Sequence, residues 1–184
     1  YNLATDNNFW TLNAFNFIAR FPDNQIIDSH DFLVIGLHNV QMFSDYYGYS
    51  PDLTLFEDMR DAINGVTTIS AGDNFASTVD LLSNPEMLML FKWEEGSDIV
   101  QDVDYFVWGN ASIGVDKTEV NGYLQETSLN DQAYQDSHEE YFTYVRFLIN
   151  NSEGAEKNTG GNGIAGNDET SENFDETWNI VLAP

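Results

Sequence analysis

The sequence contains no cysteine among its 184 residues. A disulfide framework, a thiol nucleophile and a cysteine-ligated zinc site are therefore excluded. Long apolar runs are also missing: no stretch reaches the about 18 apolar residues of a membrane-spanning helix. The first ten residues, YNLATDNNFW, lack a basic region followed by an apolar stretch, so no signal peptide is predicted.

Basic residues are scarce as well, with 6 Lys and Arg against 31 Asp and Glu, which gives a net charge of −25. Neutralising phosphates requires clustered Lys and Arg, so we expect no nucleic-acid partner. The same deficit argues against docking on an anionic membrane surface, and we expect no membrane insertion. An acidic surface stays soluble in high salt and collects divalent cations, which favours an extracellular or saline setting.

What the sequence does contain is typical of a globular chain: 42% hydrophobic and 14% aromatic residues. The length predicts one domain over residues 1–184. Short runs rich in β-branched and aromatic residues, separated by turn residues, predict an all-β fold. The expected strands are residues 1–4, 15–19, 32–37, 53–56, 65–69, 87–93, 99–108, 141–149 and 178–182.

Two short helices are expected in crossovers between strands, at residues 38–47 and 57–64. In the run 99–108, strict alternation places Asp102 and Asp104 on one face together with Phe106. Both faces of this strand carry apolar groups, so we expect the sheet to be packed on both sides. Residues 150–173 are rich in Gly and Asn and predict a long surface loop before the last strand.

Ordered sequence blocks resemble a lamin tail domain of the bacterial extracellular type. The first two blocks are FIARFPDNQIIDSHDFLVIGL, a strand, turn and strand, and HNVQMFSDYYGYSPDLTL, a short helix ending in Tyr-Gly. LLSNPEMLMLFKWEEGSDIVQDVDYFVWG is similar to a hairpin ending in Trp-Gly, and VDKTEV follows it. TGGNGIAGNDETSENFDETWNIV is similar to the closing loop and strand.

This resemblance implies an immunoglobulin-like β-sandwich and a structural or adhesive role, with no shared active site. The family's first strand, which precedes the Tyr-Asn-Leu block, is missing here, and a missing strand leaves an open sheet edge. Either the strand lies upstream in a longer protein, or a neighbouring chain donates it. Strand donation would make the chain a self-assembling subunit of a filament or surface layer.

Acidic residues supply two candidate calcium sites, because calcium prefers several carboxylate and carbonyl oxygens. The first consists of Asp98, Asp102, Asp104 and Asp116. The second lies in the Gly-rich loop and consists of Asn162, Asn167, Asp168 and Glu169. The alternatives are a solvated acidic face for the first and a flexible loop with Asx turns for the second. Calcium is therefore a possible cofactor.

Catalytic motifs are missing. The three histidines have no metal-ligand spacing, and Ser29-His30-Asp31 are adjacent residues that cannot converge on one reacting atom. A pair of carboxylates with a stacking Trp would suit a sugar substrate or a bound glycan, but a Trp in a sandwich is more often part of the core. We expect no enzyme.

A cluster of aromatic residues lies in the first predicted helix and just after it: Phe43, Tyr46, Tyr47 and Tyr49. If exposed it is a protein interface, and if buried it caps the helix on the sheet. The rare cations Arg20, Lys117 and Arg146 lie beside strands, where we expect them to approach carboxylates.

The sequence therefore predicts a non-catalytic structural or adhesive module outside the cell or at its surface. Its expected partner is a protein, either a second copy or a larger surface assembly. The first alternative is a calcium-dependent carbohydrate-binding module, and the second is an extracellular hydrolase.

Overall fold

The computed structural model describes residues 17–61, 70–71, 81, 85–94, 97, 99–118, 122–123, 126–147 and 156–183. Two compact units are present, one within Asp6–Asp80 and one within Leu81–Pro184. We call them the N-terminal and the C-terminal unit and describe each by itself. The single domain expected over 1–184 stays a prediction.

The N-terminal unit is built from very short strands. Strand β1 (Phe17–Arg20) pairs antiparallel with both β4 (Arg60–Asp61) and β5 (Ser70–Ala71). Strands β2 (Ile35–Gly36) and β3 (Leu53–Thr54) form a parallel pair. The buried core of this unit consists of Leu53, Leu55 and Met59, against which Phe17, Ala19, Phe21, Leu33 and Leu37 pack.

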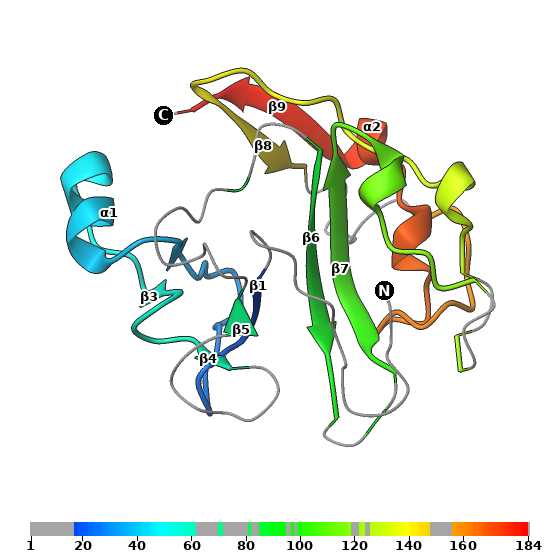
Figure 1. The fold of residues 1–184 in the computed structure, drawn as a ribbon, viewed down its shortest axis with the longest axis horizontal. Coiled ribbons are helices and arrows are strands. Elements are labelled where there is room, and N and C mark those ends of the chain that lie inside the picture. Colours follow the sequence, from blue (N-terminus) through cyan, green and yellow to red (C-terminus); the bar gives the residue numbers. More distant parts are fainter. Residues whose placement is uncertain are drawn as a thin grey trace. The chain divides into compact units, whose positions relative to one another are not determined.

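Helix α1 (Val40–Tyr47) connects β2 to β3 (Figure 1). Asn39 begins it, because its side chain accepts a hydrogen bond of 2.9 Å from the Met42 N–H. Gly48 ends it in the left-handed conformation, at φ 78°, and donates to the Ser44 carbonyl. No residue of the helix is buried, so α1 contributes little to the core.

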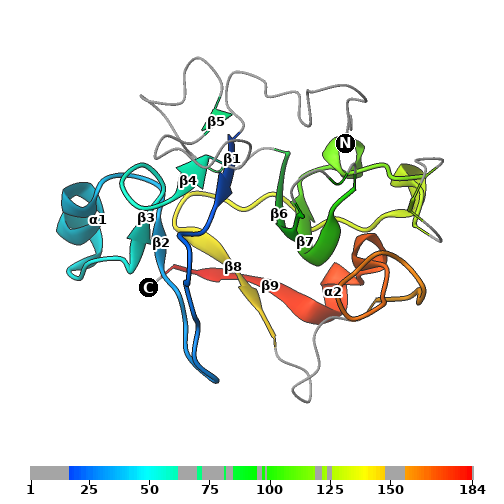
Figure 2. The same ribbon diagram turned by 90° about the horizontal axis from the view of Figure 1, so that it is seen from below.

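The C-terminal unit contains two antiparallel pairs. The longer pair is β6 (Glu86–Lys92) with β7 (Gln101–Trp108). The second pair is β8 (Phe142–Arg146) with β9 (Trp178–Leu182), which run side by side in Figure 2. The remaining elements are the 3₁₀ turns η1 (Ala111–Ile113), η2 (Leu129–Asp131) and η3 (Glu169–Ser171) and the one-turn helix α2 (Phe174–Thr177).

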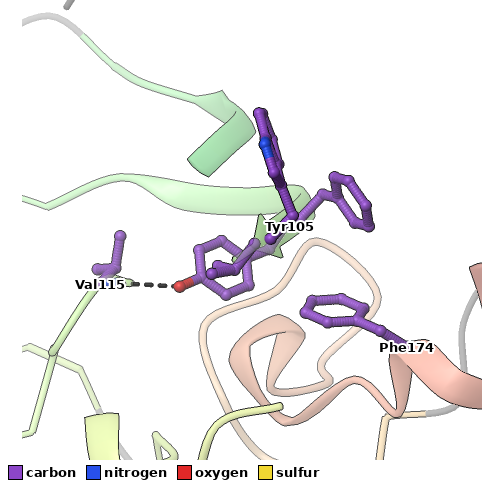
Figure 3. Packing of buried hydrophobic residues seen from close by; sticks show 6 residues of the cluster. Tyr105, Val115 and Phe174 are labelled. Atoms are coloured by element: carbon purple, nitrogen blue, oxygen red, sulfur yellow. Dashed lines mark hydrogen bonds between the residues drawn. The ribbon is translucent and has the colours of Figure 1, made fainter. Parts of the chain in front are cut away.

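An aromatic core joins these elements. Its buried residues are Tyr105, Phe106, Val107, Trp108, Val115 and Phe174, and Figure 3 shows Tyr105, Val115 and Phe174 converging from three segments. Phe106 stacks on Trp178 of β9 with ring centroids 4.1 Å apart. Because residues of both parities in β7 are buried, the expectation that this strand is packed on both faces is confirmed.

A β-bulge in β7 overturns the predicted arrangement of its two aspartates. Leu90 pairs with Asp104 and the next residue, Phe91, pairs with Asp102, so Val103 is the extra residue. Directly opposed residues share a face and successive residues alternate, so Asp102 and Asp104 point to opposite faces. The shared face predicted from strict alternation is therefore wrong.

The expectation of a mainly β-structure is confirmed, with small sheets and few helices. Strand 178–182 is found with the predicted bounds, and strand 32–37 shrinks to two residues. The helix predicted at 57–64 is wrong where it is described, because Asp58 binds the Thr54 N–H in a turn and Arg60 then pairs with β1. The predicted strands 1–4 and 65–69 lie outside the described residues.

Within the described ranges, no helix has the length and apolar character needed to cross a membrane.

Candidate functional site

Lys117 is buried inside the C-terminal unit, which is rare for a lysine. Its ammonium donates to Asp102 Oδ2 on β7 and lies 2.9 Å from Glu126 Oε2. It also donates to Asn162 Oδ1 at 2.7 Å. The Tyr123 ring covers it, with Nζ 5.2 Å from the ring centroid. We call Lys117, Asp102, Glu126, Asn162 and Tyr123 the lysine cluster.

The chain reaches this position because the segment after η1 contacts β7 at Tyr105 and again at Asp102. Val115 and Lys117 are buried, whereas the residue between them is exposed. The Val115 N–H donates to the Tyr105 hydroxyl at 2.9 Å, which fixes the register of the segment. Gly114 is required here, because a Cβ atom would lie 2.5 Å from that hydroxyl.

The Gly-rich loop closes the cluster from the other side. The Asn162 N–H donates to Glu126 Oε1 at 2.9 Å, and the Ile164 N–H donates to the Asp102 carbonyl at 2.7 Å. A Cβ atom on Gly163 would lie 2.6 Å from the Asn167 carbonyl oxygen. Glycine is therefore needed at this position because two backbone segments approach each other closely, and not because the loop must be flexible.

Negative charge exceeds positive charge in and beside the lysine cluster. Asp102 and Glu126 share one ammonium, and Asp168 lies close to both. Burial raises the pKa of Glu126 to about 7, with the Lys117 ammonium opposing the shift and the Asp168 carboxyl adding to it. Burial also raises the pKa of Asp102, against the same ammonium. Burial therefore favours the protonated form of both acids, and the Lys117 ammonium opposes this.

A second ion cluster lies on the opposite face of β7. Arg146 of β8 donates to Asp104 Oδ2 at 2.5 Å and to Glu172 Oε1 at 2.9 Å. Its guanidinium lies over the Trp178 ring, 5.5 Å from the centroid. Thr177 also donates to Glu172, at 2.6 Å. Burial raises the pKa of Glu172, which Thr177 and Arg146 oppose. We call Arg146, Asp104 and Glu172 the arginine cluster.

The first predicted calcium site is dispersed. Asp102 belongs to the lysine cluster and Asp104 to the arginine cluster. Asp116 is exposed and accepts hydrogen bonds from Thr118, and Asp98 lies outside the described residues. In the part of the chain that the structure describes, no group of three or more acidic or histidine side chains is placed to hold a metal ion. Calcium binding stays a prediction.

The residues of the second predicted calcium site are held in other ways. Asp168 is buried and accepts hydrogen bonds from Thr127 Oγ1 and Thr170 Oγ1, both at 2.6 Å. Glu169 is buried, and Asn167 donates to Glu156 at 3.5 Å. The expected exposed loop at 150–173 is wrong for residues 168–172, which are all buried. Hydrogen bonds from Thr127, Thr170 and Thr177 to the carboxylates of Asp168 and Glu172 help to hold this segment, which has no apolar residues, in the interior.

The predicted interface residues gather around α1. Phe43 contacts Tyr47 and Tyr49 with ring centroids 4.5 Å and 5.6 Å apart, and Tyr46 contacts Tyr47 at 4.8 Å. The side chains of Tyr46, Tyr47 and Tyr49 are exposed, and Phe43 is half-buried. We call these four residues the α1 patch.

Sequence reasoning missed Glu126 and Tyr123. Nothing distinguishes Glu126 among the 31 acidic residues of the chain. The useful signal was the scarcity of cations, because a cation beside a strand needs an acidic partner. The expectation that Lys117 and Arg146 approach carboxylates is confirmed.

In comparisons with known proteins, no protein-family model matches this chain, and neither a curated protein nor a solved structure gives a significant match.

Proposed function

We propose that this chain is a non-catalytic structural or adhesive module that works outside the cell and associates with further copies of itself. The observation that supports this most directly is the α1 patch: aromatic rings that contact one another on a helix without buried residues. Tyr and Phe supply large contact areas at low entropic cost, which makes such a surface suited to protein contacts.

Charge favours a second copy as the occupant of the α1 patch. The chain carries a net charge of −25, so most approaches between two copies are repulsive. Residues 39–50, which include α1, contain a single charged side chain, Asp45. This near-neutral surface is where two acidic copies meet at the lowest electrostatic cost.

The proposed fold is an immunoglobulin-like sandwich of the lamin tail type. Support comes from the C-terminal unit, where two antiparallel strand pairs share one aromatic core. The sequence blocks that resemble this family extend from Phe17 to Val181.

A non-catalytic role agrees with the way charged groups are used. Asp102 and Asp104 each contact a cation. Trp108 is buried and Trp178 packs against the aromatic core, so both rings contribute to packing in the C-terminal unit.

Sedimentation velocity of the full chain in chelator, at two concentrations about tenfold apart, tests the proposal. We expect dimers or larger assemblies at the higher concentration. The double variant Tyr46→Ser, Tyr47→Ser should sediment as a monomer, because the exposed rings supply the contact.

Ile26→Ser is the matched control, since Ile26 is 75% exposed in the same unit outside the α1 patch. This variant should assemble like the native chain. A native chain that stays monomeric at both concentrations overturns the proposal, and so does a double variant that assembles normally.

A further inference from the structure

The lysine cluster places an amine, a carboxyl electrophile and a second carboxyl in one water-excluded volume. The side chains of Lys117 and Asp102 are 0% exposed and that of Glu126 is 1% exposed. The amine contacts both acids, so the groups required to form an amide already touch. We propose that Lys117 Nζ and Asp102 Cγ become joined by an intramolecular isopeptide bond, with Glu126 as the catalytic residue.

The step is a condensation that balances without an oxidant or a co-reactant. The Lys117 ammonium passes a proton to the Asp102 carboxylate, which leaves a neutral amine beside a neutral carboxylic acid. The amine lone pair attacks Cγ, and the new C–N bond forms as the Cγ–O bond breaks. The nitrogen loses its second proton to the departing hydroxyl by way of Glu126, and one water molecule leaves.

Glu126 is placed to carry that proton because its Oε2 lies 2.9 Å from the attacking nitrogen. Its other oxygen, Oε1, accepts the Asn162 N–H, so the carboxyl is held in position. A general acid–base group works best when its pKa is close to the ambient pH, and burial raises the pKa of Glu126 to about 7. The carboxyl ends the reaction in the protonation state in which it began.

The surroundings favour the amide over a simple ion pair. A buried ion pair gives up the hydration of both charges, a cost that conversion of the two ions into a neutral amide removes. The folded chain also holds the reacting groups in contact, so the reaction does not require them to meet by diffusion in solution. Release of the water into bulk solvent completes the reaction.

Asp102 is favoured over Asn162 as the acyl partner. Asn162 also contacts the amine, but its Nδ2 donates to the Val100 carbonyl at 2.5 Å, which restrains the leaving nitrogen. Asp102 belongs to a paired strand, and Lys117 follows 15 residues later. The bond therefore ties β7 to the segment that follows η1.

Intact mass spectrometry of the denatured full chain tests the bond. We expect a mass lower than that of the sequence by one water molecule. Trypsin does not cleave after a lysine whose amine is acylated, so digestion should give the fragment 93–146 uncut. An unlinked chain gives 93–117 and 118–146 instead.

Variants identify the residues responsible. Glu126→Gln and Lys117→Arg should both show the full calculated mass and cleavage after position 117. Glu172→Gln is the matched control, because it changes a buried acid in the arginine cluster, and it should retain the loss of one water and the uncut fragment.

The intact mass and the tryptic digest of the native chain test the proposed bond even if a variant fails to fold. A native mass equal to that of the sequence overturns the proposal, and so does a loss of water with normal cleavage after Lys117. A loss of ammonia in place of water places the bond on Asn162 and overturns the assignment to Asp102.

Discussion

Glu126 shows how one buried side chain changes the way stability depends on pH. Its ordinary pKa is 4.5, and burial raises the pKa to about 7 in the folded chain. The folded state therefore binds this proton more tightly than the unfolded state does. Between these two values the unfolded state binds fewer protons, so the free energy of unfolding falls as the pH rises.

We therefore predict that the melting temperature falls between about pH 5 and pH 8, and that Glu126→Gln reduces this fall. The free energy at stake is on the order of 3 kcal/mol, from about 1.4 kcal/mol per unit of pKa. Thermal melts followed by tryptophan fluorescence at both pH values measure the difference. Equal falls in the native chain and the variant would contradict this role of Glu126.

At the scale of elements, the bulge in β7 places Asp102 in the lysine cluster and Asp104 in the arginine cluster. Val103 has no directly opposed residue on β6, so Asp102 turns to the Gly-rich loop and Asp104 turns to β8. The two strand pairs of the C-terminal unit are then joined by Arg146 as well as by the aromatic core. Breaking a buried ion pair leaves the partner carboxylate without compensation, which costs more than the pair itself is worth.

We predict that Arg146→Ala destabilises the chain by about 2 kcal/mol, the figure for a buried pair reduced for partial exposure. Lys157→Ala should change stability by less than about 0.5 kcal/mol, because Lys157 is exposed. Urea unfolding of the two variants measures both values. Equal losses for the two substitutions would show that the arginine cluster does not hold the strand pairs together.

At the scale of the whole molecule, the charge of −25 acts against compaction and against association. Only 6 basic side chains oppose 31 acidic ones. Two of the basic side chains, Lys117 and Arg146, are engaged in the ion pairs of the lysine and arginine clusters. The remaining surface is strongly acidic, and repulsion between surface charges is screened by salt over a Debye length of about 10 Å at 0.1 M.

We predict that the melting temperature and the assembled fraction both rise as NaCl is added, and that KCl acts equally at the same ionic strength. Screening is independent of the identity of the cation, whereas a specific ion site would saturate at low concentration. Melts and sedimentation across a salt series measure both effects. A melting temperature that falls with salt would show that internal ion pairs outweigh surface repulsion.

The sequence alone determined the features that depend on neighbouring residues. The strand at Trp178–Leu182 and the helix at Val40–Tyr47 follow from local patterning and from turn residues such as Gly48. The mainly β-structure was predicted from the same local patterns, and the rarity of cations follows directly from the composition. The aromatic residues of the α1 patch were identifiable because they lie close together in the chain.

The tertiary structure alone decided the lysine cluster. Its members Asp102, Lys117, Glu126 and Asn162 come from separate segments, and no local pattern marks Glu126 as the acid that meets Lys117. A single bulge residue, Val103, reverses the alternation that local reasoning assumes. Burial of residues 168–172 likewise depends on hydrogen-bond partners distant in sequence, such as Thr127. Which polar groups are buried together is set by long-range packing, and long-range packing is not encoded in any one stretch of sequence.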